Sequence, residues 1–144
     1  MKTHKYFRNK KILSLIFGGL AFVFILYRIQ KNTEENIVIE LHQTVEELNK
    51  ITPLKVDEFT RLDSVSSFKR KSLTYYYTLL QVNKSEVNID SIKNYLKPNI
   101  IKSVKNSNEL KVYKKNNISM NYLYYDLNGE FITAIEVTPE LYKK

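Results

Sequence analysis

The feature that most restricts the fold of this chain is an uncharged, apolar run from Ile12 to Tyr27. As a helix, these sixteen residues cover about 24 Å, somewhat less than the hydrocarbon core of a bilayer. The basic side chains of Lys11 and Arg28 extend the span by reaching toward the headgroups, so the run predicts a transmembrane helix over residues 12–29. A cleaved signal peptide shares the basic start, but the bulky and charged residues after Ile25 do not suit signal peptidase.

The formal net charge of +8 comes almost entirely from the two flanks of this run. Five basic residues precede the run and two follow it: Lys2, Lys5, Arg8, Lys10, Lys11, Arg28 and Lys31. This asymmetry predicts a single-pass protein of the bacterial inner membrane, with its N-terminus in the cytoplasm and its C-terminus in the periplasm. The rest of the chain is nearly neutral, which argues against binding to nucleic acid.

These observations predict four regions. They are a cytoplasmic basic flank (1–11), the transmembrane helix (12–29), a juxtamembrane amphipathic helix (30–52) and a periplasmic α+β domain (53–144). Ser14 and Gly18 share one face of the predicted span, and small residues at that spacing permit a homodimer through close approach of a second helix.

The outer part alternates between helical and strand patterns. Apolar residues at three- and four-residue steps predict a helix over 33–51, which Pro53 ends. Residues 55–65 resemble an irregular strand, and 72–82 form the strongest strand because β-branched and aromatic residues dominate. Asp90 is an expected N-cap for a helix that Pro98 breaks or kinks, and Ser107 is an expected cap for a further short helix.

The clearest strand pair is a hairpin of residues 118–126 and 130–138. Asn128-Gly129 is the preferred pair for a type I′ turn between such strands. The predicted order is therefore α-β-β-α-α-β-β. The fold class that follows is α+β, with a four-stranded antiparallel sheet and helices on one face.

The composition offers little for catalysis. The chain has no cysteine, three glycines and two histidines, so it lacks thiolate chemistry and a glycine-rich phosphate loop. His42 and Glu46 lie four residues apart on one helix face, but a metal site needs at least one more ligand. We therefore predict no catalytic residue, no metal and no cofactor, and interpret the protein as noncatalytic.

Eleven tyrosines are the unusual component of the composition. Neighbouring residues on a strand point to opposite faces, so a sheet covered by helices on one side leaves some of these rings on the other. The candidate interaction surface comprises Tyr76, Tyr122, Tyr124 and Tyr125, with Asp57, Arg61 and Asp63. The alternative is that the rings pair across strands and stabilise the sheet.

The segments PLKVDEFTRLDSV, LTYYYTLL and ISMNYLYYDLNGEFITAIEVTP resemble a group of small, uncharacterised bacterial envelope proteins. The similarity runs from Leu48 to Pro139 and implies an envelope location and a compact α+β domain. It supplies no activity. Members of that group often carry a cysteine pair, which this chain lacks.

The sequence therefore suggests a noncatalytic inner-membrane protein whose periplasmic domain binds an unknown envelope protein, for example as an immunity or inhibitor protein. A periplasmic ligand-binding or enzymatic domain and an accessory subunit of a membrane complex are the alternatives. A pocket on which Asp57, Arg61 and Asp63 converge would favour a ligand, whereas a flat sheet face would favour a protein partner.

Overall fold

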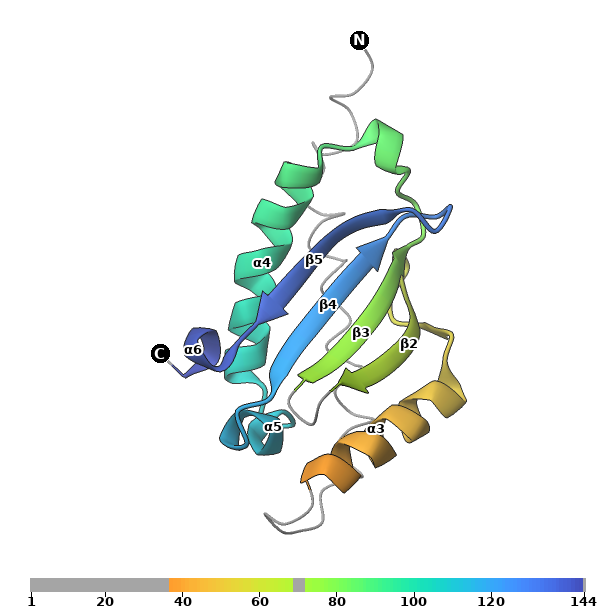
Figure 1. Ribbon diagram of the computed structural model, residues 1–144. Helices are drawn as coiled ribbons and strands as arrows, with labels where there is room; N and C mark the ends of the chain where they lie inside the picture. Colours follow the sequence, from red (N-terminus) through yellow and green to blue (C-terminus); the bar gives the residue numbers. More distant parts are fainter. Residues whose placement is uncertain (1–36, 69–71, 144) are drawn as a thin grey trace.

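The computed structural model describes residues 37–68 and 72–143. Its helices and strands are α3 (Ile37–Ile51), β1 (Leu54–Lys55), β2 (Thr60–Phe68), β3 (Ser72–Leu79), the 3-10 turn η4 (Lys84–Glu86), α4 (Ile89–Asn106), α5 (Lys111–Lys115), β4 (Ser119–Tyr125), β5 (Phe131–Val137) and α6 (Pro139–Tyr142). Figure 1 shows β2 to β5 side by side, with α3 along β2 and α4 along β5.

Five strands of the described residues form one mixed sheet in the order β1-β2-β3-β4-β5. Three of the pairings are antiparallel, but β3 and β4 run parallel, with Tyr75 opposite Tyr122 and Tyr77 opposite Tyr124. The predicted four-stranded antiparallel sheet is therefore wrong in strand number and in direction. The two-residue strand β1 and the short helix α6 are also absent from the predicted order.

The parallel pairing follows from the segment between β3 and β4. A parallel neighbour needs a crossover connection of a dozen or more residues, usually a helix, and α4 supplies it. The sequence predicted this helix, but the strands that flank it were expected to pair in the antiparallel sense. The residue pattern of each strand was compatible with parallel and with antiparallel pairing, and only the path of the crossover distinguishes the two.

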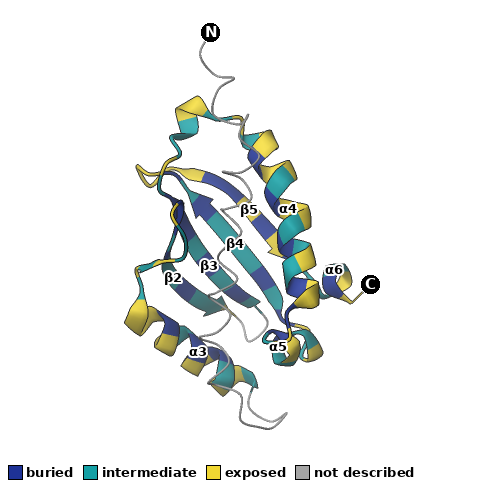
Figure 2. Ribbon diagram, turned by 180° about the vertical axis from the view of Figure 1, so that it is seen from behind, coloured by how far each residue is buried: buried dark blue, intermediate teal, exposed yellow. Residues whose placement is uncertain are grey.

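α3 belongs to the core of the domain. Its Leu41 and Leu48 are buried, as are Ile92, Leu96 and Ile100 of α4. Figure 2 shows the buried sides of both helices turned toward the sheet and their exposed sides turned outward. The hydroxyl groups of Thr44 in α3 and Tyr113 in α5 lie 2.7 Å apart in a buried hydrogen bond, which joins the two helices.

The side chain of Asn49 closes part of the free edge of β2. Its amide nitrogen donates to the backbone oxygen of Val65, and its amide oxygen accepts from the Val65 N–H, both at 2.8 Å. The pair of bonds replaces those that another strand would make. The edge beyond β1 is therefore partly sealed by a helix side chain.

α4 continues through Pro98 as a single helix. The proline and Asn94, whose carbonyl loses its usual partner, are both exposed, so water can reach the freed oxygen. The N-cap is Asn88 rather than Asp90, and its side-chain oxygen accepts from the Ser91 N–H at 2.8 Å. Ser107 accepts from the Leu110 N–H at 3.2 Å, but the N-cap of α5 is Leu110 rather than Ser107.

The β4–β5 connection differs from the predicted type I′ turn, because Gly129 has a positive φ of 82° and Asn128 does not. The Gly129 N–H donates to the Asp126 oxygen, and the Asp126 N–H donates to the Glu130 oxygen. This is a three-residue loop in which the left-handed glycine follows an ordinary turn.

None of the helices in the described part of the chain is both long and apolar enough to cross a bilayer. The transmembrane span predicted for residues 12–29, and with it the dimer contact through Ser14 and Gly18, lies outside the described residues.

Candidate interaction surface

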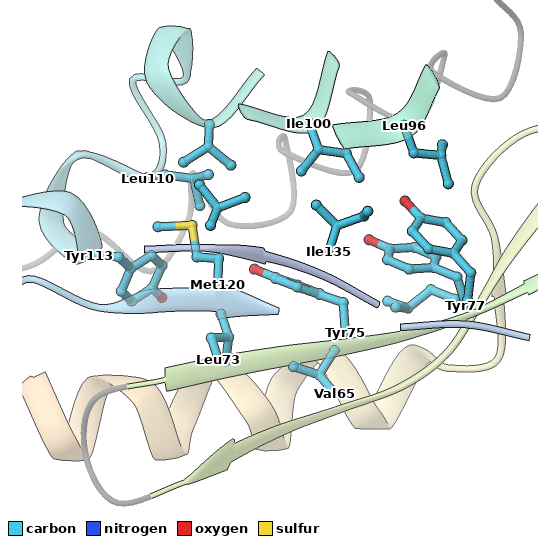
Figure 3. Packing of buried hydrophobic residues seen from close by; sticks show 14 of the residues in the cluster. Val65, Leu73, Tyr75, Tyr77, Leu96, Ile100, Leu110, Tyr113, Met120 and Ile135 are labelled. Atoms are coloured by element: carbon cyan, nitrogen blue, oxygen red, sulfur yellow. The ribbon is translucent and has the colours of Figure 1, made fainter. Parts of the chain in front are cut away.

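The sheet register divides the tyrosines between two faces. Tyr75 and Tyr77 of β3 share one face with Tyr122 and Tyr124 of β4, because these residues are register partners. Figure 3 shows Tyr75 and Tyr77 on the side of the sheet that faces α4. Tyr76 and Tyr125 point the other way.

The helix-side tyrosines form a stacked ladder. Ring centroids of Tyr75 and Tyr122 lie 5.3 Å apart, and those of Tyr77 and Tyr124 lie 5.4 Å apart, each pair with an interplanar angle of 18°. Burial raises the pKa of each of the four hydroxyl groups well above its ordinary value. These phenols stay neutral at physiological pH, and stacking across strands is a stabilising role for them.

The second face of the sheet, hereafter the open face, has no described helix over it (Figure 1). Tyr76 lies in its middle, and the hydroxyl groups of Tyr76 and Ser66 are 3.1 Å apart. Tyr125 meets Phe131 edge to face, with centroids 5.7 Å apart and an angle of 72°. The Phe131 side chain is 46% exposed, so this end of the open face presents aromatic carbon to solvent.

Polar side chains on β2 and β3 form a closed cluster on the same face. The Arg61 Nε donates to Asp63 Oδ1 at 2.5 Å, and the Thr78 hydroxyl donates to Asp63 Oδ2 at 2.5 Å. A longer contact of 3.5 Å joins Arg61 to the Thr78 hydroxyl. The carboxylate and guanidinium thus neutralise one another and hold fixed positions.

Asp57 lies apart from this cluster. It precedes β2, and its Oδ1 accepts from the Phe59 N–H at 2.8 Å, which shapes the loop after β1. The structure therefore brings Arg61 and Asp63 together on the open face with Tyr76 and Tyr125. It places Tyr122 and Tyr124 on the helix side, and it does not make Asp57, Arg61 and Asp63 converge.

Asp126, a buried carboxylate directly after β4, was not among the predicted site residues. Its oxygens accept from the backbone N–H groups of Lys84, Asn128 and Glu130 at 2.8–3.0 Å. These bonds lower the pKa of Asp126, and the bond from the Lys84 N–H is the largest cause. The signal was present as an aspartate two residues before Asn-Gly, a spacing that suits side-chain capping of a turn.

Within residues 37–68 and 72–143, no three histidine or acidic side chains come close enough to hold a metal ion. His42 is exposed on α3. The strongest chemical feature of the described surface is therefore an aromatic sheet face with an internally paired ionic cluster.

Three solved structures share the fold. A "putative secreted protein" of Pseudomonas aeruginosa superposes with a TM-score of 0.62 at 9% identity, over 77% of this chain and 98% of that chain. The type II secretion system pilotin AspS of Vibrio cholerae gives 0.55 at 10% identity, over 75% and 94%. The type 2 secretion system pilotin EpsS of Vibrio vulnificus gives 0.56 at 12% identity, over 77% and 96%.

The chain thus shares its fold with these three proteins, and the family model is the more specific match. Residues 31–132 match the domain of unknown function DUF8479, so this chain belongs to that family. The match confirms the resemblance to an uncharacterised family. No protein with a curated description matches the sequence.

These neighbours correct the predicted location. They are described as secreted or as pilotins, and none is described as a single-pass inner-membrane protein. The assignments of transmembrane helix, signal anchor and single-pass inner-membrane topology are therefore withdrawn. An apolar run with basic flanks is common to membrane anchors and signal peptides, so this pattern alone does not define a location.

Proposed function

We propose that this protein is a noncatalytic accessory protein of a cell-envelope assembly and binds a protein partner through the open face of its sheet. The observation that carries the proposal is the sheet face that none of the described helices covers, with Tyr76, Tyr125 and Phe131 beside the Arg61–Asp63 pair. The shared fold with two secretion-system pilotins supports an accessory role.

The chemistry of the open face suits a protein partner. Tyrosine and phenylalanine supply large contact areas at low cost in side-chain entropy, and they are enriched at protein interfaces. The Arg61–Asp63 bond leaves neither charge alone, so a partner can cover the pair without burying an isolated ion. A ligand or enzyme site would instead need converging polar groups, and Asp57 lies apart from the other two.

Site-specific photocrosslinking in the native host tests the proposal. A photoreactive phenylalanine analogue replaces Tyr76 or Tyr125 on the open face, or Lys97 on the exposed side of α4, in the full chain. We expect the same crosslinked partner from positions 76 and 125 and no such product from position 97.

A second variant separates loss of contact from loss of folding. Tyr125→Lys places a charge on the open face and should remove the crosslink at position 76, while Lys97→Glu should leave it intact. Far-ultraviolet circular dichroism checks that both variants fold. Crosslinks that arise only from position 97, or a crosslink at position 76 unaffected by Tyr125→Lys, would contradict the proposal.

A further inference from the structure

The last strand of the described sheet has a free edge. Among the described strands, β5 has β4 on one side and none on the other. In the described part of the chain, no hydrogen bond joins the outward backbone groups of Phe131–Val137 to another segment. The opposite edge is treated differently, because β1 and Asn49 cover part of β2. An edge with free N–H and C=O groups is a template for one further strand.

The sequence of this edge carries few of the usual protections against pairing. β5 reads FITAIEV, with no proline, no lysine and a single charge at Glu136. Natural edge strands are commonly guarded by lysine, proline, very short length or a covering helix. α4 packs along β5, but among the described residues no backbone hydrogen bond joins the two. The one irregularity in the β4–β5 register lies at Tyr124 and Tyr125, near the turn, which leaves the stretch from Thr133 onward regular.

We propose that β5 accepts an extended segment of a partner protein as a sixth strand. This rests on the proposed function, because the added strand would continue the open face. There β5 presents Phe131, Ala134 and Glu136 in succession. Phe131 and Glu136 are exposed, and neither ion pair of the described residues includes Glu136. The segment therefore carries an apolar side chain beside Phe131 and a lysine or arginine beside Glu136.

The charge on β5 favours a different protein over a second copy of this chain. Pairing of β5 with itself would bring two copies of a strand whose only charge is a carboxylate. Such a pair supplies no cation for Glu136. A cationic strand from another protein satisfies both the backbone groups and this side chain.

The probe is a synthetic peptide of alternating threonine and valine with one central lysine. N-methylation of alternate residues leaves it one free edge, so it can pair with β5 but cannot build an extended sheet with itself. We expect the peptide to slow amide hydrogen exchange of residues 133–137 in the full chain several-fold. The same peptide methylated at every residue is the control and should have no effect.

Charge exchange tests the predicted side-chain chemistry. Glu136→Lys should weaken binding of the lysine peptide several-fold and favour a peptide with glutamate in its place, while Glu58→Lys should change neither. If the lysine peptide leaves the amide hydrogen exchange of β5 unchanged, the inference is overturned. So would protection that appears without peptide as protein concentration rises, because it indicates a second copy. Crosslinks from Tyr76 and Tyr125 would still stand in either case, which separates this failure from failure of the proposed function.

Discussion

At the scale of single residues, two buried polar groups carry specific structural roles. Thr44 and Tyr113 come from elements 69 residues apart in sequence, and each hydroxyl is enclosed by apolar neighbours. A buried hydroxyl that loses its partner lowers the stability by more than the hydrogen bond itself contributes. The effects of substituting Thr44 and Tyr113 therefore depend on one another.

Thr44→Val should lower the free energy of unfolding by about 1–3 kcal/mol, because it leaves the Tyr113 hydroxyl without its partner. Tyr113→Phe in the same background should recover most of that loss, since both polar groups are then gone. Urea denaturation of the two single variants and the double variant measures the coupling. Additive losses in the double variant would show that the bond does not form.

The lowered pKa of Asp126 makes the free energy of unfolding depend on pH in the acidic range. Because the folded chain lowers its pKa, the stabilisation is fully present above the unfolded value of about 3.9 and is lost as pH falls through the folded value. We expect Asp126→Asn to lower the urea midpoint at pH 7 and to flatten the decline in stability below about pH 5. Glu58→Gln, at an exposed loop position, is the matched control. An unchanged acid limb in Asp126→Asn would contradict this assignment.

At the scale of elements, patterns within one segment were informative, and so was the hairpin signal that joins β4 to β5. Relations across longer connections could not be predicted. The periodicity of Leu41 and Leu48 predicted α3, and the aromatic run predicted β3. The direction of β4 beside β3 depends on the crossover through α4, and β1 is too short to leave a pattern. For the candidate surface, alternation correctly separated Tyr76 from Tyr75 and Tyr77. Which set the helices cover is a property of tertiary packing, which alternation does not contain.

The two hydrogen bonds between the Asn49 side chain and the Val65 backbone predict the effect of a substitution at position 49. Asn49→Asp keeps the size of the side chain but points a carboxylate oxygen at the Val65 carbonyl, where the amide had donated. We expect a loss of about 1–3 kcal/mol in unfolding free energy. Gln43→Glu, exposed on the same helix, is the matched amide-to-acid control. Amide exchange at Val65 should accelerate only in Asn49→Asp, and equal effects of the two variants would refute the seal.

At the scale of the whole molecule, the core draws on nearly the full described length, from Leu41 in α3 to Tyr142 in α6. The Tyr142 hydroxyl donates to the Ile118 oxygen at 3.0 Å, which holds the last helix to the start of β4. We infer that α3 and the sheet form one cooperative unit, which extends across the predicted boundary between residues 52 and 53.

A fragment that begins at Ile37 should therefore unfold in a single transition, with circular dichroism and tyrosine fluorescence giving the same urea midpoint. A fragment that begins at Pro53 lacks Leu41 and Leu48 and should show no cooperative transition. If the shorter fragment folded as stably as the longer one, α3 would be an appendage rather than part of the core.

The parallel pairing of β3 with β4 has a consequence for synthesis. The hairpin of β2 and β3 leaves the ribosome first, but its neighbour begins at Ser119, some forty residues later. Until β4 has been synthesised, the tyrosine rings of β3 in the nascent chain lack the β4 rings that stack against them. Pairing between residues so far apart in the sequence slows folding. A chaperone that shields the exposed side of β3 would therefore raise the yield of native protein.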